Sequence, residues 1–120
     1  MDKLLSGRKV LVVEDEMMIL MMIEDMLAEM GCTSVITAAS VDQALGLIHA
    51  QQFNAATLDV NLNGTKSYAV ADALATRGVP FVFTTGYGDL CVKDGYGNRP
   101  ILKKPFRYQD LVNVFTLLVC

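Results

Sequence analysis

The stretch Ala55-Ala56-Thr57-Leu58-Asp59 decides the fold, because its apolar run predicts a buried parallel strand that ends in a carboxylate. Three further apolar runs also end in polar groups: KVLVV in Glu14-Asp15, PFVFT in Thr85-Gly86, and ILK in Lys104-Pro105. The carboxyl ends of parallel strands meet at one edge of a sheet, where open α/β folds bind their ligands. We therefore expect three carboxylates, a hydroxyl and an ammonium to gather at that edge.

Helical patterns alternate with these runs. Apolar residues spaced three or four apart predict a first helix, and Gly31 fits the position just past its end. Ser40-Val41-Asp42-Gln43 matches a capping box that opens a second helix. The alternation predicts an α/β fold with a five-stranded parallel sheet and helices on both faces. The expected helices span residues 16–30, 40–51, 67–77 and 108–119, and a short strand lies at 35–37.

The segment from Gly86 to Pro100 differs from the rest of the chain. It is rich in glycine and shows little periodicity. Glycine weakens a helix because its backbone has more freedom to lose on folding. We expect the fourth helix of the alternation to be short or irregular, and this segment to be the least rigid part.

Length and composition agree with one small domain. With 120 residues and 52% hydrophobic content, the chain can bury one core, so residues 1–120 are expected to form a single domain. The formal charge of −3 and a pI near 4.9 argue against a nucleic-acid partner. A starting Met and the lack of a linker after Val119 favour a complete chain.

The apolar stretches and the cysteine spacing argue against membrane, secreted, disulfide-linked and zinc-binding proteins. The longest apolar stretch, Met17 to Ile23, is too short to span a bilayer, and the N-terminus lacks the apolar region of a signal peptide. A cytoplasmic protein without membrane contact is expected. Cys32, Cys91 and Cys120 are odd in number and form no CxxC motif, so neither a disulfide framework nor a zinc site is expected.

The groups at the predicted sheet edge suit a divalent cation and a phosphoryl group. Glu14, Asp15 and Asp59 offer hard oxygen ligands of the kind that Mg²⁺ prefers. Lys104 offers a point charge for a phosphoryl oxygen or for Asp59, and Thr85 offers a hydroxyl donor. A carboxylate so placed can act as a nucleophile and form an aspartyl-phosphate. The alternative is a set of polar strand ends with no shared task.

In this order, Glu14-Asp15, Asp59, Thr85-Gly86 and Lys104-Pro105-Phe106 resemble the receiver domain of two-component response regulators. The resemblance extends from Lys9 to the last helix and implies a flavodoxin-like, doubly wound (βα)5 fold. It also implies that the chain accepts a phosphoryl group from a histidine kinase or a histidine phosphotransfer protein. No output domain is expected.

The resemblance also implies a role for each site residue. Asp59 would be the phosphoacceptor, and Mg²⁺ would be bound by Asp15, by Asp59, by Glu14 directly or through water, and by the backbone carbonyl of Asn61. Thr85 would hydrogen-bond the phosphoryl group and move on activation, and Lys104 would bridge to it.

Two departures from the common receiver pattern affect these roles. The usual proline-containing turn after Asp59 is replaced by Val60-Asn61-Leu62-Asn63-Gly64, so the loop depends on Asn63-Gly64. Ile101 occupies the position of the usual switch aromatic. The stretch FVFTTGYG instead resembles a receiver subgroup with an F-A-T-G-x-Y/G signature, which makes Tyr87 the candidate moving aromatic. The competing interpretation of Tyr87 is an exposed loop residue without a function.

The first helix carries a candidate docking surface. If its main apolar stripe faces the sheet, then Met17, Leu20 and Met21 lie on the solvent side as an adaptable, methionine-rich stripe. This helix resembles the place where kinases or phosphotransfer proteins dock on receivers, and Pro105 and Phe106 are further docking candidates. The alternative is that the methionines fill gaps in the core or form an isolated apolar surface.

Three functions are open at this point. The first is a stand-alone receiver, which is no enzyme beyond catalysing its own phosphorylation and dephosphorylation, and which signals by protein contact or acts as a phosphate sink. The second is a scaffold that binds partners without being phosphorylated. The third is a phosphatase or phosphotransferase for small metabolites. A phosphatase is disfavoured because Asn61 occupies the place of its general acid, two positions beyond the nucleophile.

Overall fold

The computed structural model describes residues 4–86 and 100–119. Its main sheet has five strands in the order β2-β1-β3-β6-β7, and every neighbouring pair is parallel. This strand order is that of flavodoxin-like folds, so the predicted architecture is confirmed. The strands are β1 (Lys9–Val13), β2 (Ser34–Ala38), β3 (Ala55–Asp59), β6 (Phe81–Thr85) and β7 (Ile101–Lys103).

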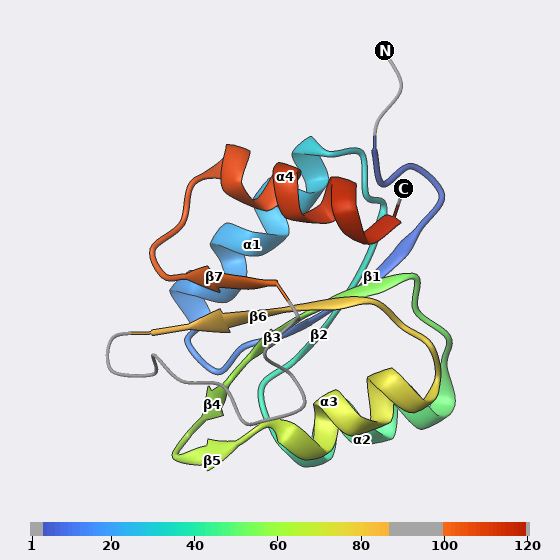
Figure 1. The fold of residues 1–120 in the computed structure, drawn as a ribbon, viewed down its shortest axis with the longest axis vertical. Coiled ribbons are helices and arrows are strands. Elements are labelled where there is room, and N and C mark those ends of the chain that lie inside the picture. Colours follow the sequence, from blue (N-terminus) through green and yellow to red (C-terminus); the bar gives the residue numbers. More distant parts are fainter. Residues whose placement is uncertain (1–3, 87–99, 120) are drawn as a thin grey trace.

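Helices cover both faces of the sheet. Figure 1 shows α1 (Met17–Glu29) and α4 (Tyr108–Val119) on one face, and α2 (Val41–Ala50) and α3 (Tyr68–Thr76) on the other. Residues alternate between the two faces along each strand. In β1, Leu11 therefore packs toward α2 and α3, while Val10 and Val12 pack toward α1 and α4. Because both faces are covered, all five residues of β3 are buried.

The helix boundaries follow local signals in the sequence. The Ser40 hydroxyl accepts the N–H of Gln43 at 3.1 Å, which confirms the cap at the start of α2. The side chain of Gln43 accepts the N–H of Ala39 at 2.9 Å, one residue before the position it takes in a standard capping box. Gly31 and Gly78, with φ of 87° and 70°, follow the ends of α1 and α3 and adopt a left-handed conformation there.

A small hairpin after β3 was not predicted. Strands β4 (Asn61–Leu62) and β5 (Thr65–Lys66) pair antiparallel, and Asn63 and Gly64 form the turn between them. Both turn residues have positive φ, 52° and 86°, as the tight turns of two-residue hairpins require. The sequence indicated a turn here but no strands. The hairpin lies at the carboxyl end of β3 (Figure 1).

The predicted docking surface is changed by the structure. Met17 and Met21 are 66% and 55% exposed, as expected, and Met18 is 85% exposed although it was not predicted. Leu20, in contrast, is half-buried against the core beneath α1 and α4. Phe106 is buried in the same core, so it offers little surface to a partner. Pro105 is exposed.

Several predictions concern residues 87–99 and Cys120, which lie outside the described residues. They include the irregular fourth helix, Tyr87 and Cys91. Cys32 is described, and it is a buried free thiol. Within residues 4–86 and 100–119, no helix combines the length and the apolar character needed to cross a bilayer.

Candidate functional site

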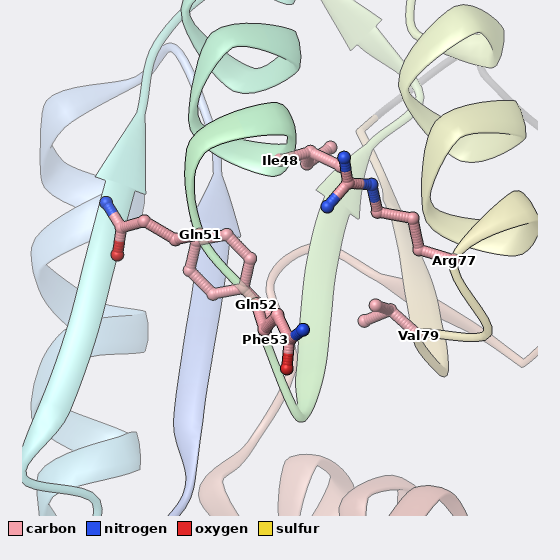
Figure 2. A pocket seen from close by; sticks show the side chains of 6 residues that line it. All are labelled: Ile48, Gln51, Gln52, Phe53, Arg77 and Val79. Carbon is pink, nitrogen blue, oxygen red and sulfur yellow. The ribbon is translucent and has the colours of Figure 1, made fainter.

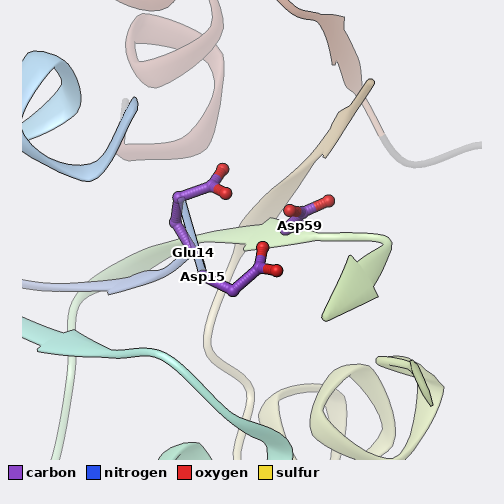
Figure 3. A group of neighbouring side chains, drawn as sticks. All are labelled: Glu14, Asp15 and Asp59. Atoms are coloured by element: carbon purple, nitrogen blue, oxygen red, sulfur yellow. The ribbon is translucent and has the colours of Figure 1, made fainter. Parts of the chain in front are cut away.

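Three carboxylates meet at the carboxyl edge of the sheet. Glu14 and Asp15 directly follow β1, and Asp59 is the last residue of the neighbouring strand β3. The parallel register pairs Val13 with Leu58, so the two strands end at the same level. Carboxylate oxygens of the three residues lie within 4.8 Å of one another (Figure 3). The clustering predicted from the strand ends is confirmed.

Lys104 joins two of these carboxylates. Its Nζ lies 2.8 Å from Glu14 Oε1 and 3.0 Å from Asp59 Oδ2, and all three side chains are almost fully buried. Its backbone is held as well, because its N–H donates to the carbonyl of Thr85 at 2.7 Å. A buried charge is tolerated when it is paired and hydrogen-bonded. The ammonium therefore balances part of the negative charge that the sheet edge collects.

Burial dominates the ionisation of the cluster. Burial raises the pKa of Glu14 to about 7, and the nearby charge of Asp59 adds to this, against the hydrogen bonds from Lys104 and the Glu16 N–H. The pKa of Asp59 is also raised, again because of burial. Burial lowers the pKa of Lys104, but its bonds to Glu14 and Asp59 outweigh that effect, so its pKa is raised. The charged forms of Glu14 and Asp59 are therefore costly in this site, and a bound cation would stabilise them.

Each carboxylate also accepts a backbone N–H. Glu14 Oε2 accepts from Glu16 at 3.0 Å, and Asp59 Oδ1 accepts from Asn61 at 3.2 Å. Asp15 Oδ2 accepts from Asn63 at 3.1 Å. Two of these three donors belong to the β4–β5 hairpin. Asn63 was not among the predicted site residues, although the Asn-Gly pair marked the turn.

The acidic cluster opens into a cleft of about 260 Å³. Among the described residues, Thr85 does not line this cleft: it is buried at the end of β6, and Gly86 takes the lining position after it. Glu16 and Gly64 line the cleft without having been predicted to do so. The lining residues are Asp15, Glu16, Asp59, Asn61, Asn63, Gly64, Gly86 and Lys104.

A second cavity, of about 310 Å³, lies at the opposite edge of the sheet, near the ends of α2 and α3. Figure 2 shows Arg77, which follows α3, extending toward Ile48 of α2. The cavity has no carboxylate among its lining residues, so it lacks the ligand set found at the carboxyl edge. It is lined by Ile48, Gln51, Gln52, Phe53, Arg77 and Val79.

The ligand set of the acidic cluster fits Mg²⁺. Carboxylate and backbone carbonyl oxygens are hard donors, and Mg²⁺ typically uses one or two carboxylates while it keeps waters and phosphate oxygens. Asp15, Asp59 and Asn61 all line the cleft, whereas Glu14 is buried behind it and is paired with Lys104. The cleft thus offers oxygen ligands for a cation, and the Lys104 ammonium provides positive charge in addition to that cation.

Receiver domains are among the solved structures similar to this one. SdrG from Sphingomonas melonis Fr1 is 41% identical, with a TM-score of 0.86 over 98% of this chain and 99% of that chain. The PhyR receiver domain from Erythrobacter litoralis is 25% identical, with a TM-score of 0.81 over 95% of this chain and 91% of that one. The receiver domain of the sensor histidine kinase PA1611 from Pseudomonas aeruginosa PAO1 has a magnesium ion coordinated in its active-site cleft. It is 25% identical, with a TM-score of 0.79 over 95% and 98% of the two chains.

Sequence comparison leads to the same family. A search of curated proteins found no match. The family model for the response regulator receiver domain matches residues 10–116, which include the whole acidic cluster and Lys104. Such domains are generally not enzymes with a separate substrate, they bind Mg²⁺ at an acidic pocket, and they interact with histidine kinases or phosphotransfer proteins. The chain belongs to the response regulator receiver domain family of two-component signalling.

Proposed function

We propose that this receiver accepts a phosphoryl group on Asp59 from a phosphohistidine and then signals by protein contact or acts as a phosphate sink. One observation carries the proposal: the buried Asp59 carboxylate lies 3.0 Å from the Lys104 ammonium and clusters with the carboxylates of Glu14 and Asp15, a group suited to a cation. A nucleophilic carboxylate needs nearby positive charge to offset the charge that develops on a phosphoryl group.

In the proposed reaction, an Asp59 carboxylate oxygen attacks the phosphorus atom. The P–N bond to the donor histidine breaks, and its electron pair returns to the imidazole nitrogen, which takes up a proton. The N–H of Asn61, on Asp59 Oδ1, helps to hold the carboxylate in place. Lys104 stabilises the negative charge on the transferred phosphoryl group. Because it pairs with both Glu14 and Asp59, it also reduces the repulsion between these two carboxylates. The domain thereby catalyses its own phosphorylation.

We propose Mg²⁺ as the cofactor of this step. Bound Mg²⁺ would offset the negative charge of the phosphoryl oxygens. Asp15, Asp59 and the backbone carbonyl of Asn61 would ligate it directly, and Glu14 would do so directly or through water. The proposal is supported by the clustered oxygens in this chain and by the magnesium ion in the PA1611 receiver domain.

Thr85 and Tyr87 are proposed as the switch. The position of Thr85 at the end of β6, with its carbonyl bonded to the Lys104 N–H, ties it to the site. Its hydroxyl would move toward the phosphoryl group on Asp59, and Tyr87, two residues later, would move with it. SdrG, which is 41% identical, has also been solved in a BeF3-activated conformation.

For the partner, we propose docking on α1. The exposed side chains of Met17, Met18 and Met21 form the methionine surface, and Pro105, the residue after Lys104, is exposed as well. Methionine side chains adapt to varied apolar partners, and exposed apolar clusters often mark contact sites. The partner would be a histidine kinase or a histidine phosphotransfer protein.

The deciding experiment is intact mass after incubation with Mg²⁺ and either acetyl phosphate or a phosphorylated histidine donor. The wild-type chain is expected to gain one phosphoryl group, which hydroxylamine removes because it is an acyl phosphate. Asp59→Ala should gain none, while Asp42→Ala, at an exposed carboxylate of α2, should behave as wild type. No gain in the wild type with either donor would favour the scaffold that acts by binding alone.

A further inference from the structure

The β4–β5 hairpin is fastened to two site carboxylates by its own backbone. The N–H of Asn61 donates to Asp59 Oδ1 at 3.2 Å, and the N–H of Asn63 donates to Asp15 Oδ2 at 3.1 Å. Leu62, between the two donors, is the extended strand residue that pairs with Thr65, so the N–H groups of Asn61 and Asn63 both lie on the side of β4 away from β5 and serve the two carboxylates. Backbone donors on a strand edge usually face solvent, but here they face the site.

The rest of the hairpin is anchored independently of the carboxylates. Ser67, which is fully buried, donates its hydroxyl to the carbonyl of Asp59 and its N–H to the carbonyl of Val60 at 2.9 Å. Leu62 is buried in the core beneath α2 and α3. With the base of the hairpin and Leu62 held in place, the direction of the Asn63 N–H depends on the turn that contains it.

That turn has an unusual backbone. Asn63 and Gly64 have φ of 52° and 86°, in the left-handed region that most residues avoid. A β-carbon added at Gly64 would have no heavy atom within 4 Å outside its chain neighbours. An alanine at Gly64 therefore acts through the backbone conformation of the turn and not through a steric clash of its β-carbon with the site.

We propose that the Asn63-Gly64 turn is a positioning element for Asp15. The positive-φ turn lets Leu62 pair with Thr65, which holds the peptide between Leu62 and Asn63 so that the Asn63 N–H donates to Asp15 Oδ2 and keeps that carboxylate in the orientation it has in the acidic cluster. The inference rests on the proposed function, because it takes Mg²⁺ to be the ion that Asp15 binds. Hydrogen-bond partners of metal ligands fix the ligand's orientation, and losing one typically costs about 10- to 100-fold in metal affinity.

The test compares two glycines with similar backbones. Gly78 also has a positive φ, 70°, and an added β-carbon there also meets nothing within 4 Å, but it follows α3 next to the cavity at the opposite edge of the sheet. Calorimetric titration should show Mg²⁺ affinity about tenfold weaker in Gly64→Val and unchanged in Gly78→Val. Gly64→Asn should keep most of the affinity, because Asn tolerates the left-handed conformation. Gly64→Ala is a milder change in the same direction and replaces Gly64→Val if that variant does not fold.

A second readout needs no metal. Amide hydrogen exchange without Mg²⁺ should show a protected Asn63 N–H in the wild type and faster exchange in Asp15→Ala and in Gly64→Val. Equal Mg²⁺ affinity in the wild type and Gly64→Val would overturn the positioning role while leaving the proposed function intact. Unchanged exchange at Asn63 in Asp15→Ala would overturn the hydrogen bond itself. A wild-type chain that binds no Mg²⁺ would overturn the proposed function, and the metal role of the turn with it.

Discussion

Lys104 lies between two buried carboxylates, and this determines what its loss should do. In Lys104→Met, Glu14 and Asp59 stay buried without their cation, which typically costs about 3–5 kcal/mol when both are charged. We expect a loss of about 3 kcal/mol in the free energy of unfolding at pH 8. At pH 5 the loss should be smaller, because Glu14, with its pKa near 7, is then protonated.

Urea unfolding at the two pH values measures this difference. Arg107→Met is the matched control, since Arg107 pairs with Asp110 on the surface and its loss should change stability little at either pH. An equal loss at pH 5 and pH 8 for Lys104→Met would contradict the charge explanation and point to lost packing of the lysine stem.

Glu14 should make stability depend on pH. Its pKa is raised from 4.5 to about 7 in the folded state, so its contribution is complete below pH 4.5 and is lost as the pH rises to 7. The raised pKa of Asp59 acts in the same direction. Two and a half pKa units correspond to about 3 kcal/mol. With EDTA present, unfolding free energies from pH 4.5 to 8 should fall less steeply for Glu14→Gln than for the wild type, and parallel curves would refute this.

At the scale of single residues, much of the site could be predicted from the sequence. Glu14, Asp15, Asp59 and Lys104 were found because each follows a short apolar run, and parallel register brings strand ends together. That Lys104 bonds both Glu14 and Asp59 could not be predicted, because it depends on how far each strand extends beyond the sheet edge. Thr85 does not line the cleft because it is the last residue of β6, and where that strand ends could not be predicted from the sequence either.

At the scale of elements, α1 offers a test of partner docking. Replacing Met17, Met18 and Met21 together by Ser should slow phosphoryl transfer from a phosphorylated histidine donor protein by about tenfold or more, as for central interface residues. Phosphorylation by acetyl phosphate should stay unchanged, because these side chains do not line the cleft. Rates from rapid quench and intact mass measure both reactions.

A control for this experiment lies on α4. Leu117 is 78% exposed, so Leu117→Ser removes one exposed apolar side chain from a different helix. It should leave transfer from the donor protein at the wild-type rate. If the α1 triple variant and Leu117→Ser slow transfer equally, the effect is not specific to α1 and the docking proposal fails.

Elements were predicted well where they are long and periodic. Helices α1, α2, α3 and α4 lie within a residue or two of their expected bounds, because their apolar residues are periodic, Ser40 caps α2, and Gly31 and Gly78 follow α1 and α3. The β4–β5 hairpin was missed because strands of two residues are too short to show a period. Leu20 and Phe106 were placed on the surface because their burial depends on contacts between α1, α4 and the sheet, which one element's pattern does not contain.

At the scale of the whole molecule, Mg²⁺ should stabilise the fold. A ligand that binds only the folded state adds about 2.7 kcal/mol at a concentration 100 times its dissociation constant. Urea unfolding with increasing Mg²⁺ should show this gain in the wild type. Asp15→Asn should show a much smaller gain, because it removes a carboxylate that lines the cleft. A gain of the same size in both proteins would place the ion elsewhere.

The order of the strands also bears on how the molecule is made. After β1 and β2 pair, β3 joins the free side of β1, β6 joins β3, and β7 joins β6. Among the strands of residues 4–86 and 100–119, none of the later ones in this sheet has to enter between two that are already paired. The sheet can therefore grow outward in the order in which the ribosome releases the chain, and each new strand finds its template already in place.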